Sequence, residues 1–358
     1  MESLLEISGL TVELPTAQGW VRPVNDVSLR IHAGECLGLV GESGSGKTML
    51  SLALMGLLPT GGRVKGHAWL PGAPPALWNE SSPKPAGSDY RKDVLAASEE
   101  ELRAMHGREM AMIFQEPMTS LNPVMRVGVQ VEEAIRAHYP KMPAQLVRKG
   151  MLEALRLAAL PGPAERAKQY PHQLSGGLRQ RVMIAMAIAA GLADPGLEMT
   201  SLEKRKPGEV LVGSRLLIAD EPTTALDVTV QKEILELLQK LRRDLGLGLL
   251  FITHDLGVVA QVADRVAVMY AGRVVEAGPA KEVLREPKHP YTQGLLAASP
   301  KLERGKLTPI PGNVPQLTAL PPGCAFEPRC GLRRDECRTA MPDLRAASEE
   351  HAARCVLV

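Results

Sequence analysis

The chain has 358 residues, enough for one large domain or two ordinary ones with a substantial core. Its 42 Lys and Arg residues nearly cancel its 40 Asp and Glu residues, and only 3% of the residues are aromatic, so neither bulk charge nor base-stacking side chains indicate nucleic-acid binding. The longest strongly apolar stretch, 182–193, is too short to span a bilayer, and the N-terminus lacks the features of a signal peptide. We therefore expect a cytosolic protein that reaches a membrane only through partners.

The first predicted strands, at 4–14 and 27–40, lead into a glycine-rich loop at 41–48. The loop reads Gly-Glu-Ser-Gly-Ser-Gly-Lys-Thr, which fits the phosphate-binding pattern G-x-x-x-x-G-K-S/T, and an apolar helix is predicted directly after it. Its glycines let successive backbone N–H groups face one concavity, and the helix N-terminus adds positive potential. The residues expected at the phosphates are Gly41, Ser43, Gly44, Ser45, Gly46, Lys47 and Thr48. The sequence thus predicts a nucleoside triphosphate site.

Regular elements alternate along the rest of the chain. The predicted helices lie at 127–137, 145–158, 176–192 and 228–243. The predicted strands lie at 216–220, 249–253 and 265–270. The proline-rich residues 71–92 and the irregular, charged residues 194–214 are expected to be solvated surface loops. Alternation of strands and helices indicates a mostly parallel α/β sheet.

Two further motifs contain candidate catalytic and anion-binding residues. The apolar strand at 216–220 ends in Asp220, which a buried strand can bring to Mg²⁺, and Glu221 follows where it can take a proton from an attacking water. Ser175 is a good N-cap for the helix at 176–192, and Gly176 and Gly177 leave the backbone amides of that helix start uncovered. Such a turn can receive an anion, although on its own it would be an ordinary capped helix.

Taken together, these motifs resemble the ABC ATPase family. Gln115 matches the Q-loop of that family, residues 224–227 its D-loop and His254 its switch histidine. The resemblance implies an α/β fold: an ABC-type P-loop ATPase with a RecA-like core and an inserted helical subdomain at about 116–192. We expect this nucleotide-binding domain to cover 1–286 and a cysteine-containing extension to cover 287–358.

The resemblance also implies roles for the matched residues. Lys47 and the loop amides would hold the phosphates of ATP, while Thr48, Gln115 and Asp220 would arrange Mg²⁺. Glu221 would activate water and His254 would sense the γ-phosphate. In a head-to-tail dimer, the ATP on one loop would be closed by residues of the other subunit, namely Ser175, Gly176, Gly177 and Asp227. Hydrolysis to ADP and phosphate would reopen the dimer.

Longer stretches are similar to the ATPase subunits of oligopeptide and dipeptide importers. They include Gln-Glu-Pro-Met-Thr-Ser-Leu-Asn-Pro at 115–123, residues 219–229, His-Pro-Tyr-Thr at 289–292 and Ile-Pro-Gly-Asn-Val-Pro at 310–315. Residues 178–187 resemble the D-type rather than the F-type subunit. The resemblance implies ATP-driven peptide import at the cytoplasmic face of a bacterial inner membrane, with peripheral attachment. Implied partners are an F-type ATPase subunit, two transmembrane permease subunits and a substrate-binding protein, with no nucleic acid.

Other functions within and outside this class stay open. Importers of nickel or another small solute share these motifs, and a soluble non-transport ABC ATPase is a rival that usually carries two ATPase units or long core insertions. The sequence also departs from the family in places. Leu178 stands where many members carry Gln, and the aromatic that commonly stacks on adenine is not clearly placed, with Gln18 near its position and Trp20 two residues later. Residues 73–92 and 196–213 look like insertions.

Four of the five cysteines lie in the last 35 residues: Cys324, Cys330, Cys337 and Cys355. The fifth, Cys36, lies in a predicted strand and is expected to be a small core residue. Thiols clustered in a cytosolic tail indicate metal ligands more than disulfides, but their spacing lacks C-x-x-C pairs, so the residues alone leave zinc and iron–sulfur open. Residues 323–330 resemble the motif that holds a [4Fe–4S] cluster in peptide-importer ATPases, which favours such a cluster with a structural role.

Overall fold

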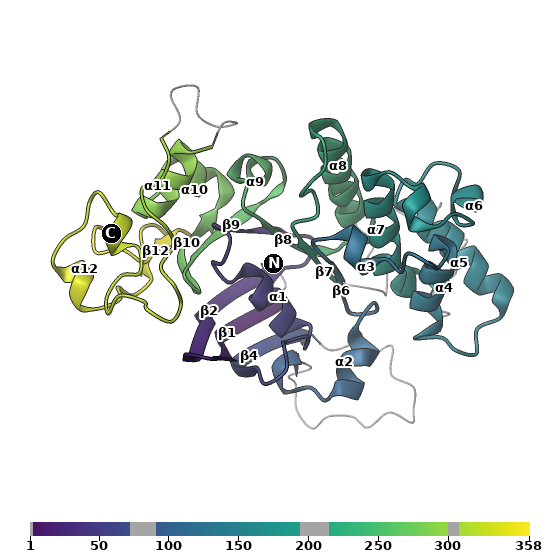
Figure 1. Cartoon of the computed structure of the whole chain (residues 1–358), viewed down its shortest axis with the longest axis horizontal. Helices are drawn as coiled ribbons and strands as arrows, with labels where there is room; N and C mark the ends of the chain where they lie inside the picture. The colour runs from purple at the N-terminus through teal and green to yellow at the C-terminus, as the bar shows by residue number, and fades with distance from the viewer. Residues whose placement is uncertain (1–2, 72–90, 194–214, 300–307) are drawn as a thin grey trace. The chain divides into compact units, whose positions relative to one another are not determined.

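The structure, a computed structural model, describes residues 3–71, 91–193, 215–299 and 308–358 (Figure 1). The chain divides into two compact units: the first contains 1–32, 37–102 and 253–358, and the second contains 33–36 and 103–252. Of the surface loop expected at 71–92, residues 72–90 lie outside the described residues, whereas residue 71 ends one strand and residues 91–93 form another. The loop expected at 194–214, with the insertion at 196–213, lies outside the described residues. No helix in the described ranges is both long and apolar enough to cross a membrane.

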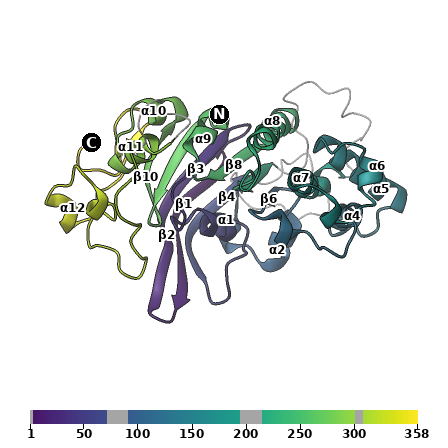
Figure 2. The same ribbon diagram turned by 45° about the horizontal axis from the view of Figure 1, so that its top comes forward.

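The first unit opens with an antiparallel sheet. Strands β1 (Ser3–Thr16) and β2 (Gly19–His32) form a hairpin, and β4 (Arg63–Pro71) and β5 (Arg91–Asp93) extend the sheet in the order β2-β1-β4-β5 (Figure 2). Apolar and polar residues alternate along β1 and β2, so one face is buried. Val12 and Val24, which are paired across the hairpin, are both fully buried.

A second set of strands in the first unit positions the phosphate-binding loop. Strand β3 (Cys36–Val40) is buried at every position and runs parallel to β9 (Arg265–Tyr270), which pairs with the antiparallel β10 (Arg273–Pro279). Helix α1 (Lys47–Leu54) follows β3, and α9 (Leu256–Val262) precedes β9. Gly38 is required here, because a Cβ at this position would lie 2.8 Å from the side chain of Val259.

The C-terminal segment is packed onto these strands. After β10 come α10 (Ala280–Arg285), α11 (Pro290–Ala297), the 3₁₀ turn η5 (Glu327–Arg329), α12 (Glu336–Thr339) and the short strands β11 (Arg345–Ala346) and β12 (Ala352–Ala353), and Figure 1 shows β12 beside β10. Glu276 on β10 is fully buried and accepts hydrogen bonds from the backbone N–H groups of Lys288 and His289. It also lies 2.7 Å from His351 Nε2. One carboxylate therefore ties both ends of the segment to the sheet.

In the described part of the second unit, strands run parallel in the order β6-β7-β8. They are β6 (Met110–Ile113), β7 (Leu216–Asp220) and β8 (Gly248–Thr253). All three are buried along their length, as expected for a parallel sheet covered on both faces. Helix α8 (Val228–Leu245) connects β7 to β8, and α2 (Glu99–Met105) precedes β6.

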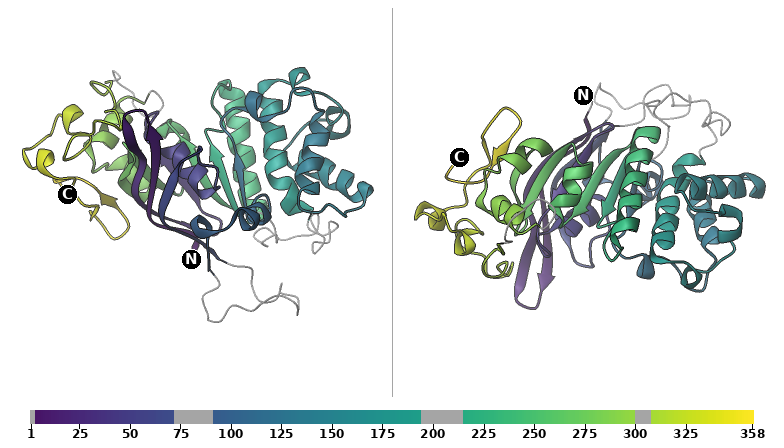
Figure 3. Two further views of the ribbon diagram at one scale, coloured as in Figure 1. Left: turned by 60° about the horizontal axis from the view of Figure 1, so that its bottom comes forward. Right: turned by 90° about the horizontal axis from the view of Figure 1, so that it is seen from above.

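The remaining helices form a layer of their own, drawn in blue to teal in Figure 3. They are α3 (Pro117–Ser120), α4 (Val127–Arg136), α5 (Ala144–Leu157), α6 (Pro163–Arg166), the 3₁₀ turn η3 (Pro171–Gln173) and α7 (Gly176–Leu192). Helix α4 buries Val127, Val131 and Ile135, which recur every four residues along one face. Helix α7 buries most of its residues from Val182 to Leu192 and packs against α4, α5 and α8.

Candidate functional site

The backbone of the glycine-rich loop adopts conformations and close approaches that only glycine permits. Gly46 caps α1 with φ of +104°, a conformation that L side chains rarely adopt, and a Cβ there would lie 2.0 Å from the carbonyl oxygen of Pro23. At Gly41 a Cβ would lie 2.2 Å from the carbonyl oxygen of Met269. Gly44 also has positive φ, with open space around its Cα, and Ser43 is exposed beside it. The loop is therefore held tightly at its two ends and is open at Gly44.

Lys47 lies inside this loop. Its ammonium group donates hydrogen bonds to the carbonyl oxygens of Gly41 at 2.8 Å and Glu42 at 3.0 Å, and it lies 3.4 Å from Ser45 Oγ. The backbone N–H of Ser45 also donates to Glu42 O, at 3.2 Å. Only 5% of Lys47 is exposed. The loop carbonyls therefore hold the positive charge of Lys47 at the N-terminus of α1. The potential at a helix N-terminus is also positive, so both groups favour an anionic ligand at this place.

His254 follows β8 directly and is exposed. The next residue, Asp255, caps α9 by accepting hydrogen bonds from the N–H groups of Gly257 and Val258, and its own N–H donates to Thr253 Oγ1. The backbone on either side of His254 is fixed by these bonds, so the imidazole is presented from a rigid turn.

In the second unit, the carboxyl end of β7 brings three of the predicted residues together. Asp220 ends the strand and is 1% exposed. Glu221 has φ of +45°, an uncommon conformation for this residue type, and its N–H donates to Ile252 O at 2.9 Å. Its Oε2 accepts hydrogen bonds from Gln115 Nε2 at 3.3 Å and from Thr224 Oγ1 at 2.8 Å. Two neutral donors therefore orient a carboxylate beside a buried aspartate.

The predicted signature lies at the N-terminus of α7. Ser175 is exposed and accepts a hydrogen bond from the N–H of Leu178, as an N-cap does, and Gly176 and Gly177 form the first turn. Gly177 packs against α8, because a Cβ there would lie 2.5 Å from Val230 Cγ1. Asp227 caps α8 through the N–H groups of Thr229 and Val230. The starts of α7 and α8 are thus adjacent, and both present exposed caps.

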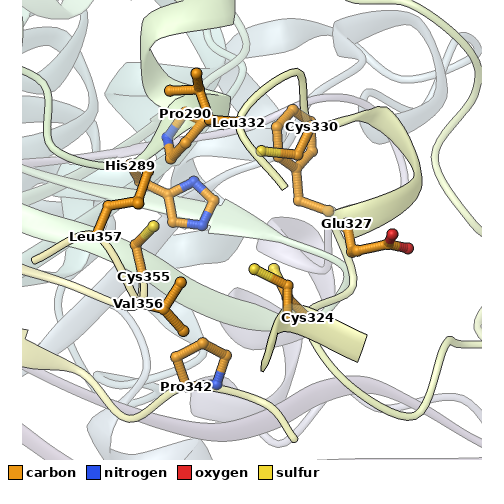
Figure 4. Close-up of a pocket in the computed structure, with 12 residues that line it drawn as sticks. His289, Pro290, Cys324, Glu327, Cys330, Leu332, Pro342, Cys355, Val356 and Leu357 are labelled. Atoms are coloured by element: carbon orange, nitrogen blue, oxygen red, sulfur yellow. The ribbon is translucent and has the colours of Figure 1, made fainter. Parts of the chain in front are cut away.

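The four C-terminal cysteines line one cavity in the first unit, and Cys36 is elsewhere, fully buried in β3 as expected. About 320 Å³ between these residues is not filled by protein, and this figure includes space that is open to solvent. Figure 4 shows the sulfur atoms of Cys324, Cys330 and Cys355 turned toward the space beside the His289 ring. Burial raises the pKa of the Cys324 thiol to about 11 and lowers the pKa of His289 to about 4, so both side chains are neutral at pH 7.

The arrangement of the four cysteines can be compared with the ligand geometry of two metal groups. In the described ranges, no group of three His, Cys, Asp or Glu side chains is close enough to ligate one metal ion. A structural zinc needs four sulfurs within about 2.3 Å of a single point, whereas a [4Fe–4S] cluster takes one thiolate at each of several irons. In the described residues the four thiols line one cavity without three of them meeting at a single point.

Two side chains of the C-terminal segment contact the phosphate-binding loop, and no sequence pattern predicts these contacts. Tyr291 Oη accepts a hydrogen bond from the N–H of Glu42 at 2.8 Å, and the Arg329 guanidinium donates to both carboxylate oxygens of Glu42. These residues are about 250 and 290 positions from the loop, so only tertiary structure brings them together.

Trp20, the aromatic residue considered for adenine stacking, is 48% exposed, with the guanidinium of Arg63 at 4.2 Å from its ring centroid.

The phosphate-binding loop, the carboxylate-ended strand β7 and the capped helix α7 define an ATP-binding cassette. The family description for ABC transporters matches residues 24–192, and the description for the C-terminal region of oligopeptide/dipeptide transporters matches residues 275–337. The expected fold, an ABC-type P-loop ATPase, is confirmed.

Individual proteins agree with these matches. A putative peptide import ATP-binding protein of Brucella ovis is 44% identical over 99% of this chain and 97% of the relative. The dipeptide transport ATP-binding protein DppD of Bacillus subtilis is 42% identical over 100% of this chain and 95% of the relative. Among solved structures, the dimeric ATP-binding cassette MJ0796 in a post-hydrolysis state bound to ADP and Pi matches with a TM-score of 0.58 and 25% identity, over 77% of this chain and 99% of that one. The chain belongs to the family of peptide-import ATP-binding proteins of ABC transporters, and it is an ABC ATPase.

Proposed function

We propose that this chain is the ATP-hydrolysing subunit of a bacterial ABC importer that powers the uptake of dipeptides and oligopeptides. The observation that carries the catalytic part is Glu221, a carboxylate fixed by Gln115 and Thr224 directly after the buried Asp220. The peptide part is supported by full-length similarity to relatives named for peptide or dipeptide import. Nickel or another small solute is the alternative substrate.

In the first unit, the proposed roles concern the phosphates. Lys47 leaves the loop carbonyls and binds the β- and γ-phosphates, while the backbone N–H groups of 41–48 surround them. The Thr48 hydroxyl is a ligand for Mg²⁺, which neutralises phosphate charge when it is bound. His254 is the sensor of the γ-phosphate, presented from the capped turn before α9.

In the second unit, the proposed roles concern metal binding and proton transfer. Asp220 and Gln115 are the further Mg²⁺ ligands, and Glu221 accepts the proton of the attacking water. Positioned proton transfer of this kind typically contributes about 10²–10⁴ in rate. The hydrogen bond from Gln115 to Glu221 supports the proposal that Gln115 connects metal binding with orientation of the base.

The signature is proposed to act on the ATP of a second ATPase subunit. Ser175, Gly176 and Gly177 form the N-terminus of α7, where the helix dipole favours an anion, and Asp227 lies at the adjacent cap of α8. The partners we propose are an F-type ATPase subunit, two transmembrane permease subunits and a substrate-binding protein. Attachment is peripheral, at the cytoplasmic face of the bacterial inner membrane.

The cysteine cavity is proposed to hold a [4Fe–4S] cluster with a structural role, ligated by Cys324, Cys330, Cys337 and Cys355. Protein purified without oxygen should then contain about four irons per chain and absorb visible light. Cys330→Ser should lower both, while Cys36→Ala should leave both unchanged. Stoichiometric zinc with no visible absorbance would contradict this assignment.

The transport role is tested with the complete importer in lipid vesicles. ATP hydrolysis should rise when peptide-loaded binding protein is added on the outside and should not rise when the same protein is added without peptide. The complex carrying Glu221→Gln should bind ATP without hydrolysing it under either condition. Stimulation by a nickel-loaded or another solute-loaded binding protein, and none by peptide, would reject the peptide substrate while leaving the ATPase role intact.

A further inference from the structure

Among the hydrogen bonds of the described residues, the C-terminal segment binds the phosphate-binding loop through Glu42, at its backbone N–H and at both carboxylate oxygens. Arg329 forms a bidentate pair with the carboxylate of Glu42, with N–O distances of 2.7 and 3.0 Å. Tyr291 Oη accepts the backbone N–H at 2.8 Å. The backbone carbonyl of Glu42 is the acceptor for Lys47. The conformation of Glu42 is therefore set by the extension on one side and by Lys47 on the other.

Arg329 is held firmly in place. Its side chain is only 5% exposed, and it donates further hydrogen bonds to Pro311 O at 2.9 Å and to Tyr270 Oη at 3.3 Å. Phe326, three residues earlier, stacks edge-on against Tyr270 and packs against Tyr291. A buried, multiply bonded arginine of this kind cannot follow a moving loop, so it fixes the loop to the core.

The ion pair between Glu42 and Arg329 affects the charge that a bound nucleotide meets. Glu42 places a carboxylate within a loop that receives phosphates, and a negative charge there opposes an anionic ligand. The Arg329 guanidinium neutralises that carboxylate in a fixed, planar geometry. When Lys47 turns toward phosphate, Glu42 loses one of its loop contacts, and the bonds from Arg329 and Tyr291 remain to hold its shape.

We propose that Arg329 and Tyr291 are positioning residues for ATP binding: Arg329 neutralises the Glu42 carboxylate, and both residues hold Glu42 in the conformation in which the loop binds phosphates. The C-terminal extension thereby contributes to nucleotide binding by positioning a residue of the phosphate-binding loop. This inference rests on the proposed nucleotide role of residues 41–48, and it does not depend on what the cysteine cavity holds.

The test compares Arg329→Gln, Glu42→Gln and the double variant with the unmodified protein in the assembled importer. The Kd for Mg·ATP and the KM should rise about tenfold in Arg329→Gln, which corresponds to about 1.4 kcal/mol. The kcat at saturating ATP should stay within about twofold. The double variant should bind ATP within about threefold of the unmodified protein, because the uncompensated carboxylate is gone.

Two further variants separate positioning from folding. Arg338→Gln is the matched control: this exposed arginine of the same extension pairs with Glu327 and makes no contact with Glu42 among the described hydrogen bonds, so ATP binding should be unchanged. Tyr291→Phe keeps the ring and removes the acceptor, and it decides the question if Arg329→Gln does not fold; we expect a rise in Kd of about fivefold.

The outcomes are distinct. ATP binding by Arg329→Gln and Tyr291→Phe equal to the unmodified protein, or a loss in Arg329→Gln that Glu42→Gln does not relieve, would overturn the inference. Failure of the unmodified protein itself to bind Mg·ATP would instead reject the proposed function.

Discussion

Gly177 offers a sharp test of how closely the starts of α7 and α8 approach. A Cβ at this position would lie 2.5 Å from Val230 Cγ1, closer than real Cβ contacts allow, so one of the two groups must move. Val230 cannot simply rotate, because a β-branched side chain in a helix has one strongly preferred rotamer. Gly177→Ala therefore has to push the first turn of α7 away from α8.

The magnitude follows from two opposing effects. Overpacking of this kind costs about 1–3 kcal/mol, and replacing a helical glycine by alanine returns about 0.5–1 kcal/mol. We expect a net loss of roughly 0.5–2 kcal/mol in the free energy of unfolding, with Tm falling by about 2–4 °C per kcal/mol. Gly176→Ala is the matched control, because its Cβ would meet Leu226 Cδ2 at an ordinary 3.5 Å. It should be neutral or slightly stabilising.

Thermal and chemical denaturation of both variants, with and without Val230→Ala, measure these effects. Val230→Ala removes the clashing methyl group and should restore most of the stability lost in Gly177→Ala. Equal stability of Gly176→Ala and Gly177→Ala, or no relief from Val230→Ala, would refute the close packing of the two helices.

Three other predictions follow from the geometry of the second unit. Glu221→Gln should keep ATP binding, while the rate of phosphate release should fall by a factor of about 10²–10⁴. Release at the unmodified rate would show that Glu221 does not accept the proton of the attacking water. Asp227→Ala removes two capping hydrogen bonds from α8 and should lower the free energy of unfolding by about 1 kcal/mol. An unchanged midpoint of urea denaturation would show that this cap does not stabilise the protein. Burial, and next the charge of Arg108, lower the pKa of His138, so the folded state binds its proton at lower pH than the unfolded state does. The stability from neutral His138 is present above about pH 6.5 and lost as pH falls below it; His138→Asn should flatten that slope, and an unchanged slope would rule out His138 as its source.

Much of the fold could be predicted from local patterns. The helix expected at 176–192 and the strand expected at 216–220 match α7 and β7 residue for residue, because their apolar runs are bounded by a good N-cap and by a carboxylate. The loop at 41–48 was equally clear, since its glycines are required by positive φ and close backbone contacts. The division into 1–286 and 287–358 stays a prediction.

The contacts between distant segments could not be predicted. Nothing near Arg329 or Tyr291 indicates that they contact Glu42, since neither residue lies in a nucleotide motif. The pairing of Glu221 with Gln115 was not visible either, although both were predicted site residues, because it depends on β6 lying beside β7. Sequence patterns identify the chemical groups, and tertiary packing decides which of them meet.

The central claim, that this ATPase drives peptide import, is tested most directly by purifying the tagged protein from native membranes in mild detergent. We predict that transmembrane permease subunits, a second ATPase subunit of F-type and a substrate-binding protein carrying peptide will co-purify. Recovery with ribosomes or nucleic acid, and without membrane proteins, would contradict the account.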